Sequence, residues 1–128
     1  MYRSSFPVKN WYDIGIKMKQ GGTRYFIGVD GGGTGCRAAI ADPQGQVVAR
    51  AEAGPANATT DADQAIANVR IAVRRAALAV GLDETALYNI GAHVGLAGVL
   101  DDAIAGRIAA GLEMGPVTVT DDRVTSIA

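Results

Sequence analysis

The segment Asp30-Gly31-Gly32-Gly33-Thr34 separates two apolar runs and is the first candidate for chemistry. Asp-Gly and Gly-Gly are favoured dipeptides of tight hairpin turns. A plain hairpin gains nothing from a third glycine, which adds to the entropy lost on folding. Three glycines instead allow close backbone approach to a ligand, with N–H groups turned toward an anion. The segment therefore predicts either a turn or a phosphate site, in which Asp30 could hold a metal ion through water and Thr34 offers a hydroxyl.

Known phosphate-binding patterns narrow this second interpretation. The segment has no Gly-Lys-Ser/Thr, so it is not a Walker A loop, and it does not open a helix as the dinucleotide-binding Gly-x-Gly-x-x-Gly does.

Two acidic residues, Asp121 and Asp122, close the last apolar run. Paired acids at a strand end often cap a helix or are simply solvated. A carboxylate there could equally accept a hydroxyl proton during phosphoryl transfer.

Small or amide residues follow two other apolar runs. Gly95, Leu96, Ala97 and Gly98 would leave room for a ligand, or merely turn the chain into the next helix. Asn57, in the stretch Gly-Pro-Ala-Asn, has a side chain suited to sugar hydroxyls, although asparagine is common in turns.

The single histidine and the single cysteine favour structural roles. His93 lies within an apolar run, and we expect it to be a core residue. Cys36 is expected to be a small strand residue, because one thiol forms neither an internal disulfide nor, alone, a zinc or iron–sulfur site.

Hydrophobic patterning predicts the elements that position these residues. Three strands over 24–30, 36–42 and 46–53 form an antiparallel meander. A helix capped by Thr60 or Asp61 then runs to about Val80. A strand over 88–98, a helix capped by Asp101 or Asp102, a strand over 116–122 and the start of another helix follow. This order predicts an α/β fold, a mixed sheet with helices packed on it in a ribonuclease-H-like layout.

Composition bounds the class of protein. The chain has 128 residues, 48% of them hydrophobic and 20% charged, with a formal net charge of −1. These values are typical of a globular domain and give no electrostatic footprint for nucleic acid. No apolar run approaches the roughly 18 residues of a membrane span, and the N-terminus lacks the apolar core of a secretory signal. The simplest compartment is a reducing cytoplasm.

Residues 1–22 differ from the rest of the sequence. They hold every lysine and the only tryptophan, Trp11, and are net positive whereas the remainder is net negative. We expect an extension in the form of a disordered tail. Alternatively, Met18 is the true start and leads directly into the first strand.

Four short motifs follow one another in an order that is typical of a known family: Gly-Val-Asp-Gly-Gly-Gly-Thr at 28–34, Gly-Pro-Ala-Asn at 54–57, Gly-Leu-Ala-Gly at 95–98, and Thr-Asp-Asp followed by Ser-Ile-Ala at 120–128. Over about residues 24–128 the chain thereby resembles the N-terminal, actin-like ATPase domain of the sugar-kinase/Hsp70/actin superfamily. It is most similar to the N-acetylglucosamine kinase and BadF/BadG-type ATPase family, which includes bacterial glucosamine kinases. The resemblance implies transfer of the γ-phosphoryl group of Mg-ATP to a hydroxyl of glucosamine or N-acetylglucosamine.

The resemblance also implies roles for residues. The segment 30–34 would be the first phosphate loop, with Asp30 near Mg²⁺. Asn57 and the Gly95–Gly98 turn would contact the sugar. The family spacing Thr-Asp-x-x-x-Ser-Ile-Ala selects Asp122, not Asp121, as the acceptor of the sugar hydroxyl proton. ATP and Mg²⁺ are the implied cofactors and an amino sugar the implied partner, with neither nucleic acid nor membrane, and a homodimer is left open.

The family has a second domain, which carries another phosphate loop and the adenosine pocket. We therefore expect residues 23–128 to be the N-terminal domain of a two-domain kinase, nearly inactive alone.

Three alternatives stay open. An ATPase that activates a 2-hydroxyacyl-CoA dehydratase or benzoyl-CoA reductase would need Cys36 as ligand to a 4Fe–4S cluster. A repressor–kinase (ROK) protein would show a more Gly-Gly-Thr-Lys-like loop. A non-catalytic actin-like domain would bind sugar or nucleotide without turnover.

Overall fold

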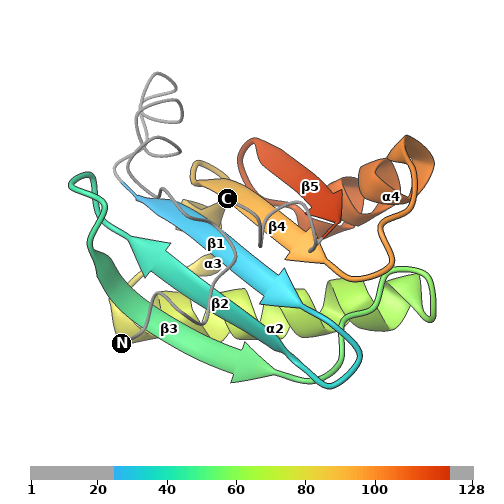
Figure 1. Ribbon diagram of the computed structural model, residues 1–128. Helices are drawn as coiled ribbons and strands as arrows, with labels where there is room; N and C mark the ends of the chain where they lie inside the picture. The colour runs from blue at the N-terminus through green and yellow to red at the C-terminus, as the bar shows by residue number, and fades with distance from the viewer. Residues whose placement is uncertain (1–24, 122–128) are drawn as a thin grey trace.

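Five strands form one mixed sheet in the computed structural model, which describes residues 25–121 (Figure 1). They are β1 (Phe26–Gly31), β2 (Cys36–Ala41), β3 (Val47–Ala53), β4 (Gly91–Leu96) and β5 (Val117–Asp121). Their order across the sheet is β3-β2-β1-β4-β5. The first three pair antiparallel, whereas β4 lies parallel to β1 and β5 parallel to β4. The predicted meander and mixed sheet are confirmed.

Two longer helices, α2 (Ala62–Ala79) and α4 (Asp102–Leu112), begin at the predicted capping residues. The Asp61 carboxylate accepts a hydrogen bond from the N–H of Gln64, and the Asp101 carboxylate accepts one from Ile104. Each cap thus satisfies an N–H that the first turn leaves unpaired. Within the described residues no helix is long and apolar enough to cross a membrane.

A third helix, α3 (Glu84–Leu87), was not predicted. It comprises a single turn capped by Asp83, too short for a helical repeat of apolar residues to appear in the sequence. Because α3 and the turn after it use residues 84–90, β4 begins at Gly91 rather than at position 88.

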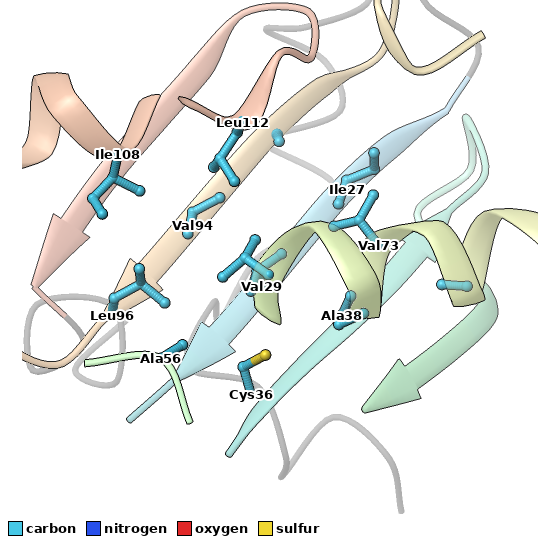
Figure 2. Close-up of a cluster of buried hydrophobic side chains, with 14 of the residues drawn as sticks. Ile27, Val29, Cys36, Ala38, Ala56, Val73, Val94, Leu96, Ile108 and Leu112 are labelled. Atoms are coloured by element: carbon cyan, nitrogen blue, oxygen red, sulfur yellow. The ribbon is translucent and has the colours of Figure 1, made fainter. Parts of the chain in front are cut away.

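The core lies between one face of the sheet and the helices α2 and α4. Figure 2 shows side chains of this cluster, among them Ile27, Val29, Cys36, Val94 and Leu96 from the strands. Because successive strand residues point to opposite faces, Asp30, Arg37 and His93 lie on the other face.

His93 is therefore not the core residue that its apolar surroundings predicted. Its side chain is partly buried on the face opposite the helices, with Nε2 3.5 Å from the hydroxyl oxygen of Thr120. Burial lowers the pKa of the imidazole below its usual value. A ring so placed is neutral at pH 7.

The direction of the strands determines where the candidate residues meet. β1, β3, β4 and β5 run the same way, and only β2 runs opposite (Figure 1). The segments that follow these four strands therefore leave the sheet at one edge. Ligand sites of open α/β sheets are found at the carboxyl ends of parallel strands.

Candidate functional site

Three connecting segments lie together at this edge. We call them the glycine loop (residues 31–35, after β1), the asparagine loop (54–60, after β3) and the β4 turn (97–100). Main-chain hydrogen bonds link all three: the Gly31 carbonyl accepts from Ala97 N–H at 2.9 Å, Gly32 from Ala56 at 2.8 Å, and Ala97 from Ala58 at 2.8 Å. Segments far apart in sequence are thus held as one unit.

The glycine loop is a hairpin in geometry, closed by a 3.0 Å hydrogen bond from the Gly32 N–H to the Gly35 carbonyl. Its glycines, however, do not adopt the left-handed conformation that tight primed turns require. Within residues 25–121 the positive-φ glycines are Gly45, Gly81 and Gly98, none of them in this loop. Turn conformation therefore does not explain the three consecutive glycines.

Packing explains the first of them. A Cβ atom on Gly31 would lie 2.7 Å from Leu96 Cδ2 and 3.0 Å from the Cβ atoms of Ala56 and Cys36. A larger residue there would push β1 away from β4 and from the asparagine loop.

Packing does not explain Gly33, at the tip of the loop. A Cβ atom on Gly33 would meet no heavy atom within 4 Å. Gly33 and Thr34 are both exposed, and no hydrogen bond within residues 25–121 uses either N–H. Two free donors beside open space are what an anion-binding backbone provides. Among the described residues nothing occupies these two donors, so they are available to a phosphate.

Asp30, the last but one residue of β1, is not a free carboxylate. Its Oδ2 forms an ion pair with Nη2 of Arg37, which stands directly opposite in the β1–β2 ladder. Arg37 follows Asp30 by seven residues in the sequence, but it belongs to none of the four motifs, which therefore do not predict this pair. Oδ1 has no partner among the described residues.

One carboxylate oxygen fits a Mg²⁺ ion that takes its other ligands from phosphate and water, the usual protein arrangement for this cation. Nowhere in residues 25–121 do three acidic, histidine or cysteine side chains gather as a metal cluster. The donor set present therefore suits a nucleotide-bound cation rather than a metal held by protein alone.

Asn57 and Gly98, both predicted to contact a sugar, are in contact with each other. The Asn57 Oδ1 accepts hydrogen bonds from the N–H groups of Thr59 and Thr60, at 3.0 and 2.9 Å. Gly98 has a φ of +86°, and its Cβ position lies 2.5 Å from Asn57 Oδ1. The hydroxyl of Thr59 donates to the Gly98 carbonyl. The Asn57 side-chain oxygen is thus used inside the loop, whereas its amide NH₂, a donor, has no partner among the described residues.

The four residues of the predicted Gly95–Gly98 turn lie in two different environments. Gly95 is buried in β4, and the Leu96 side chain is fully buried in the core (Figure 2). Ala97 and Gly98 are partly exposed. Leu96 thus supports the site from beneath, and its side chain has no access to a ligand. Asp122, the predicted proton acceptor, lies outside the described residues.

Cys36 is 2% exposed and packs in the core (Figure 2). Burial, the largest cause, raises the pKa of its thiol to about 11. The protonated, enclosed sulfur is unsuited to iron, so an iron–sulfur role finds no ligand in this chain's only cysteine.

Comparison with known proteins gives a family match. A sequence model of the BadF/BadG/BcrA/BcrD ATPase family matches residues 27–122. The glucosamine kinase GspK of Vibrio cholerae serotype O1 is 41% identical over 73 residues, which are 57% of this chain and 24% of that protein. The chain thus spans about a quarter of this curated relative.

Solved structures agree on the fold. A Chromobacterium violaceum protein assigned as an N-acetylglucosamine kinase superposes with a TM-score of 0.66 at 27% identity, over 77% of this chain and 35% of that one. A ROK-family glucokinase from Streptomyces griseus, solved with glucose and AMPPNP, gives a TM-score of 0.54 at 22% identity, over 76% and 33%. The predicted α/β, actin-like ATPase fold is confirmed.

The loop geometry predicts an order of stability among three glycine-to-alanine variants. Gly98→Ala combines a strained φ with a collision against Asn57, and should lower the free energy of unfolding by about 2–3 kcal/mol. Gly81→Ala has the strained φ of +76° in open space, and should cost about 1 kcal/mol. Gly33→Ala should stay within about 0.5 kcal/mol of the parent. Urea denaturation followed by circular dichroism measures all three, and a Gly33→Ala as costly as Gly98→Ala would contradict this account.

Proposed function

The chain belongs to the BadF/BadG/BcrA/BcrD ATPase family, and we propose that it forms the N-terminal domain of an ATP-dependent amino-sugar kinase. The substrate would be glucosamine or N-acetylglucosamine, the sugars named for the Vibrio cholerae and Chromobacterium violaceum proteins that it resembles.

A single observation carries the proposal. The N–H groups of Gly33 and Thr34 have no partner among residues 25–121, and they lie on a loop that is tied to the asparagine loop and the β4 turn by main-chain hydrogen bonds. Phosphoryl transfer depends on positioning and on neutralising charge more than on covalent chemistry. A hydrogen-bonded cluster with main-chain donors at one point and an amide donor at another suits the task of holding a phosphate and a sugar in fixed relation.

On the nucleotide side, the glycine loop would bind phosphate oxygens through these two N–H groups and the hydroxyl of Thr34. Asp30 Oδ1 would hold Mg²⁺, directly or through water. When bound, the cation neutralises charge on the transferred phosphoryl group.

On the sugar side, Asn57 would donate its side-chain amide to a hydroxyl, and Ala97 and Gly98 would bound the space beside it. Asp122 would accept the proton of the attacking hydroxyl. Support comes from its place in the sequence directly after β5, the neighbour of β4 that runs parallel to it.

The domain proposal is that residues 23–128 form the N-terminal unit and residues 1–22 an extension. A second domain of the family would supply the adenosine pocket and another phosphate loop. The proposal agrees with the coverage of the relatives: the chain matches 24% of the length of the Vibrio cholerae protein and 35% of the Chromobacterium violaceum protein.

The 128-residue chain alone should therefore show no phosphoryl transfer. Purified chain, incubated with ATP, Mg²⁺ and either glucosamine or N-acetylglucosamine, should release ADP no faster than without sugar in a coupled assay. Sugar-dependent ADP release by the chain would contradict the two-domain proposal.

The assignment of the proton acceptor is tested in the complete enzyme by two neighbouring variants. Asp122→Asn should lower kcat by at least about 100-fold and leave sugar binding unchanged, because the amide cannot take a proton. Asp121→Asn is the matched control and should keep most of the activity.

Equal losses in the two variants would contradict the choice of Asp122. A parent enzyme that binds sugar but transfers no phosphoryl group would instead favour a non-catalytic binding domain.

A further inference from the structure

Arg37 is the charged residue next to the glycine loop to which neither the sequence motifs nor the proposed mechanism gives a role. It lies on β2, three positions beyond Thr34, with its Cα opposite that of Asp30. Its neighbours Cys36 and Ala38 point into the core, so its own side chain lies on the opposite face. The side chain is 43% exposed, against 16% for Asp30. The guanidinium is therefore solvent-accessible while the carboxylate is mostly covered.

The glycine loop contains no positive charge of its own, since no lysine or arginine occurs from Asp30 to Cys36. The described residues contain six arginines: Arg37, Arg50, Arg70, Arg74, Arg75 and Arg107. Arg70, Arg74 and Arg75 belong to α2, Arg107 to α4 and Arg50 to β3. Arg37 alone follows the loop directly.

The four arginines on the helices already have partners of their own. Arg70 pairs with Glu113, Arg74 with Glu84 and Arg107 with Asp63, while Arg75 donates to the main-chain carbonyl of Glu52. None of them is paired with a residue of the glycine loop. Among the described arginines, Arg37 is thus the one nearest in sequence to the glycine loop, and it is the candidate counter-charge for a polyphosphate bound there.

Most N–H donors of Arg37 have no partner among residues 25–121. A guanidinium has five N–H donors. The one hydrogen bond of Arg37 to a described residue is donated by Nη2 to Asp30 Oδ2. Two carboxylates flank Arg37 in the strand ladder, Asp30 on β1 and Glu52 on β3, and the ion pair is with Asp30. The bond orients the Asp30 carboxylate, with Oδ2 occupied and Oδ1 without a partner among the described residues.

We propose that Arg37 supplies the fixed positive charge of this phosphate site. It holds Asp30 by one oxygen, so that the other faces the cation, and it donates its remaining N–H groups to phosphate oxygens bound at the glycine loop. A planar fork of donors suits this double task, because it can engage a carboxylate and a phosphate together. The inference rests on the proposed function, and it adds a phosphate-binding residue that the motifs do not contain.

Binding of inorganic tripolyphosphate to the 128-residue chain tests the inference. This probe carries the charges of a nucleotide triphosphate without needing an adenosine pocket. With Mg²⁺ present, Arg37→Gln should weaken binding by about tenfold or more, as expected for loss of a charge-assisted hydrogen bond. The affinity of Arg37→Lys should lie between those of the parent and Arg37→Gln, because lysine keeps the charge but lacks the planar fork of donors.

Arg74→Gln is the matched control. Arg74 is 44% exposed and pairs with the carboxylate of Glu84 at 3.0 Å. The substitution therefore removes the same charge and the same kind of ion pair, but on α2. Its tripolyphosphate affinity should equal that of the parent. Circular dichroism and the urea midpoint should show that both variants stay folded, which separates a binding loss from unfolding.

A measurement without Mg²⁺ separates direct contact from action through Asp30. In the presence of a chelator, Asp30→Asn should bind tripolyphosphate as well as the parent or better, because it removes a like charge from the site. Arg37→Gln should still bind more weakly.

Parent-like affinity in Arg37→Gln, an equal loss in Arg74→Gln, or a loss confined to the Mg²⁺ condition would each overturn the inference while the proposed kinase function stands. A parent chain that binds no tripolyphosphate would contradict the phosphate site itself, and the inference with it.

Discussion

The common direction of four strands is the constraint on which the candidate site depends. β1, β3, β4 and β5 end at the same edge of the sheet, so the segments that follow them converge there even though β1 and β5 are about 90 residues apart. Main-chain bonds from Ala97 to Gly31, from Ala56 to Gly32 and from Ala58 to Ala97 then fasten three of these segments together. The backbone carbonyls of the glycine loop accept hydrogen bonds from the neighbouring loops, while the N–H groups at its tip have no partner in the part of the chain that the structure describes. One short segment therefore serves both as a structural junction and as a donor surface.

Small residues are needed at this junction for different physical reasons. Gly31 is small because Leu96, Ala56 and Cys36 pack against it, and Gly98 because its φ is positive and Asn57 touches it. Gly33 satisfies neither condition, because a Cβ atom there would meet no heavy atom within 4 Å. The core beneath the site, with Leu96 and Cys36 fully or nearly buried, gives the loops a fixed base. Positioning of this kind is what phosphoryl transfer asks of a protein.

Much of the fold was predictable from local signals. The apolar runs of the strands, the capping aspartates of α2 and α4, and the order of elements could all be predicted from short stretches of sequence. The one-turn helix α3 gave no periodic signal, and the apolar neighbours of His93 hid the fact that alternate strand residues face opposite sides. For the site, the motifs located the loops but not their contacts. The Asp30–Arg37 pair depends on strand register, and the meeting of Asn57 with Gly98 depends on tertiary packing across 41 positions. The role of Asp122 stays a prediction.

We propose that the tip of the glycine loop binds phosphate through its main-chain N–H groups. The most direct measurement is a titration of the ¹⁵N-labelled chain with Mg-ATP, followed by amide chemical shifts. The account predicts the largest shifts at Gly33 and Thr34, with little change at Gly81, a glycine in open space at the end of α2. Saturating Mg-ATP that leaves Gly33 and Thr34 unmoved, or that shifts residues elsewhere in their place, would contradict it.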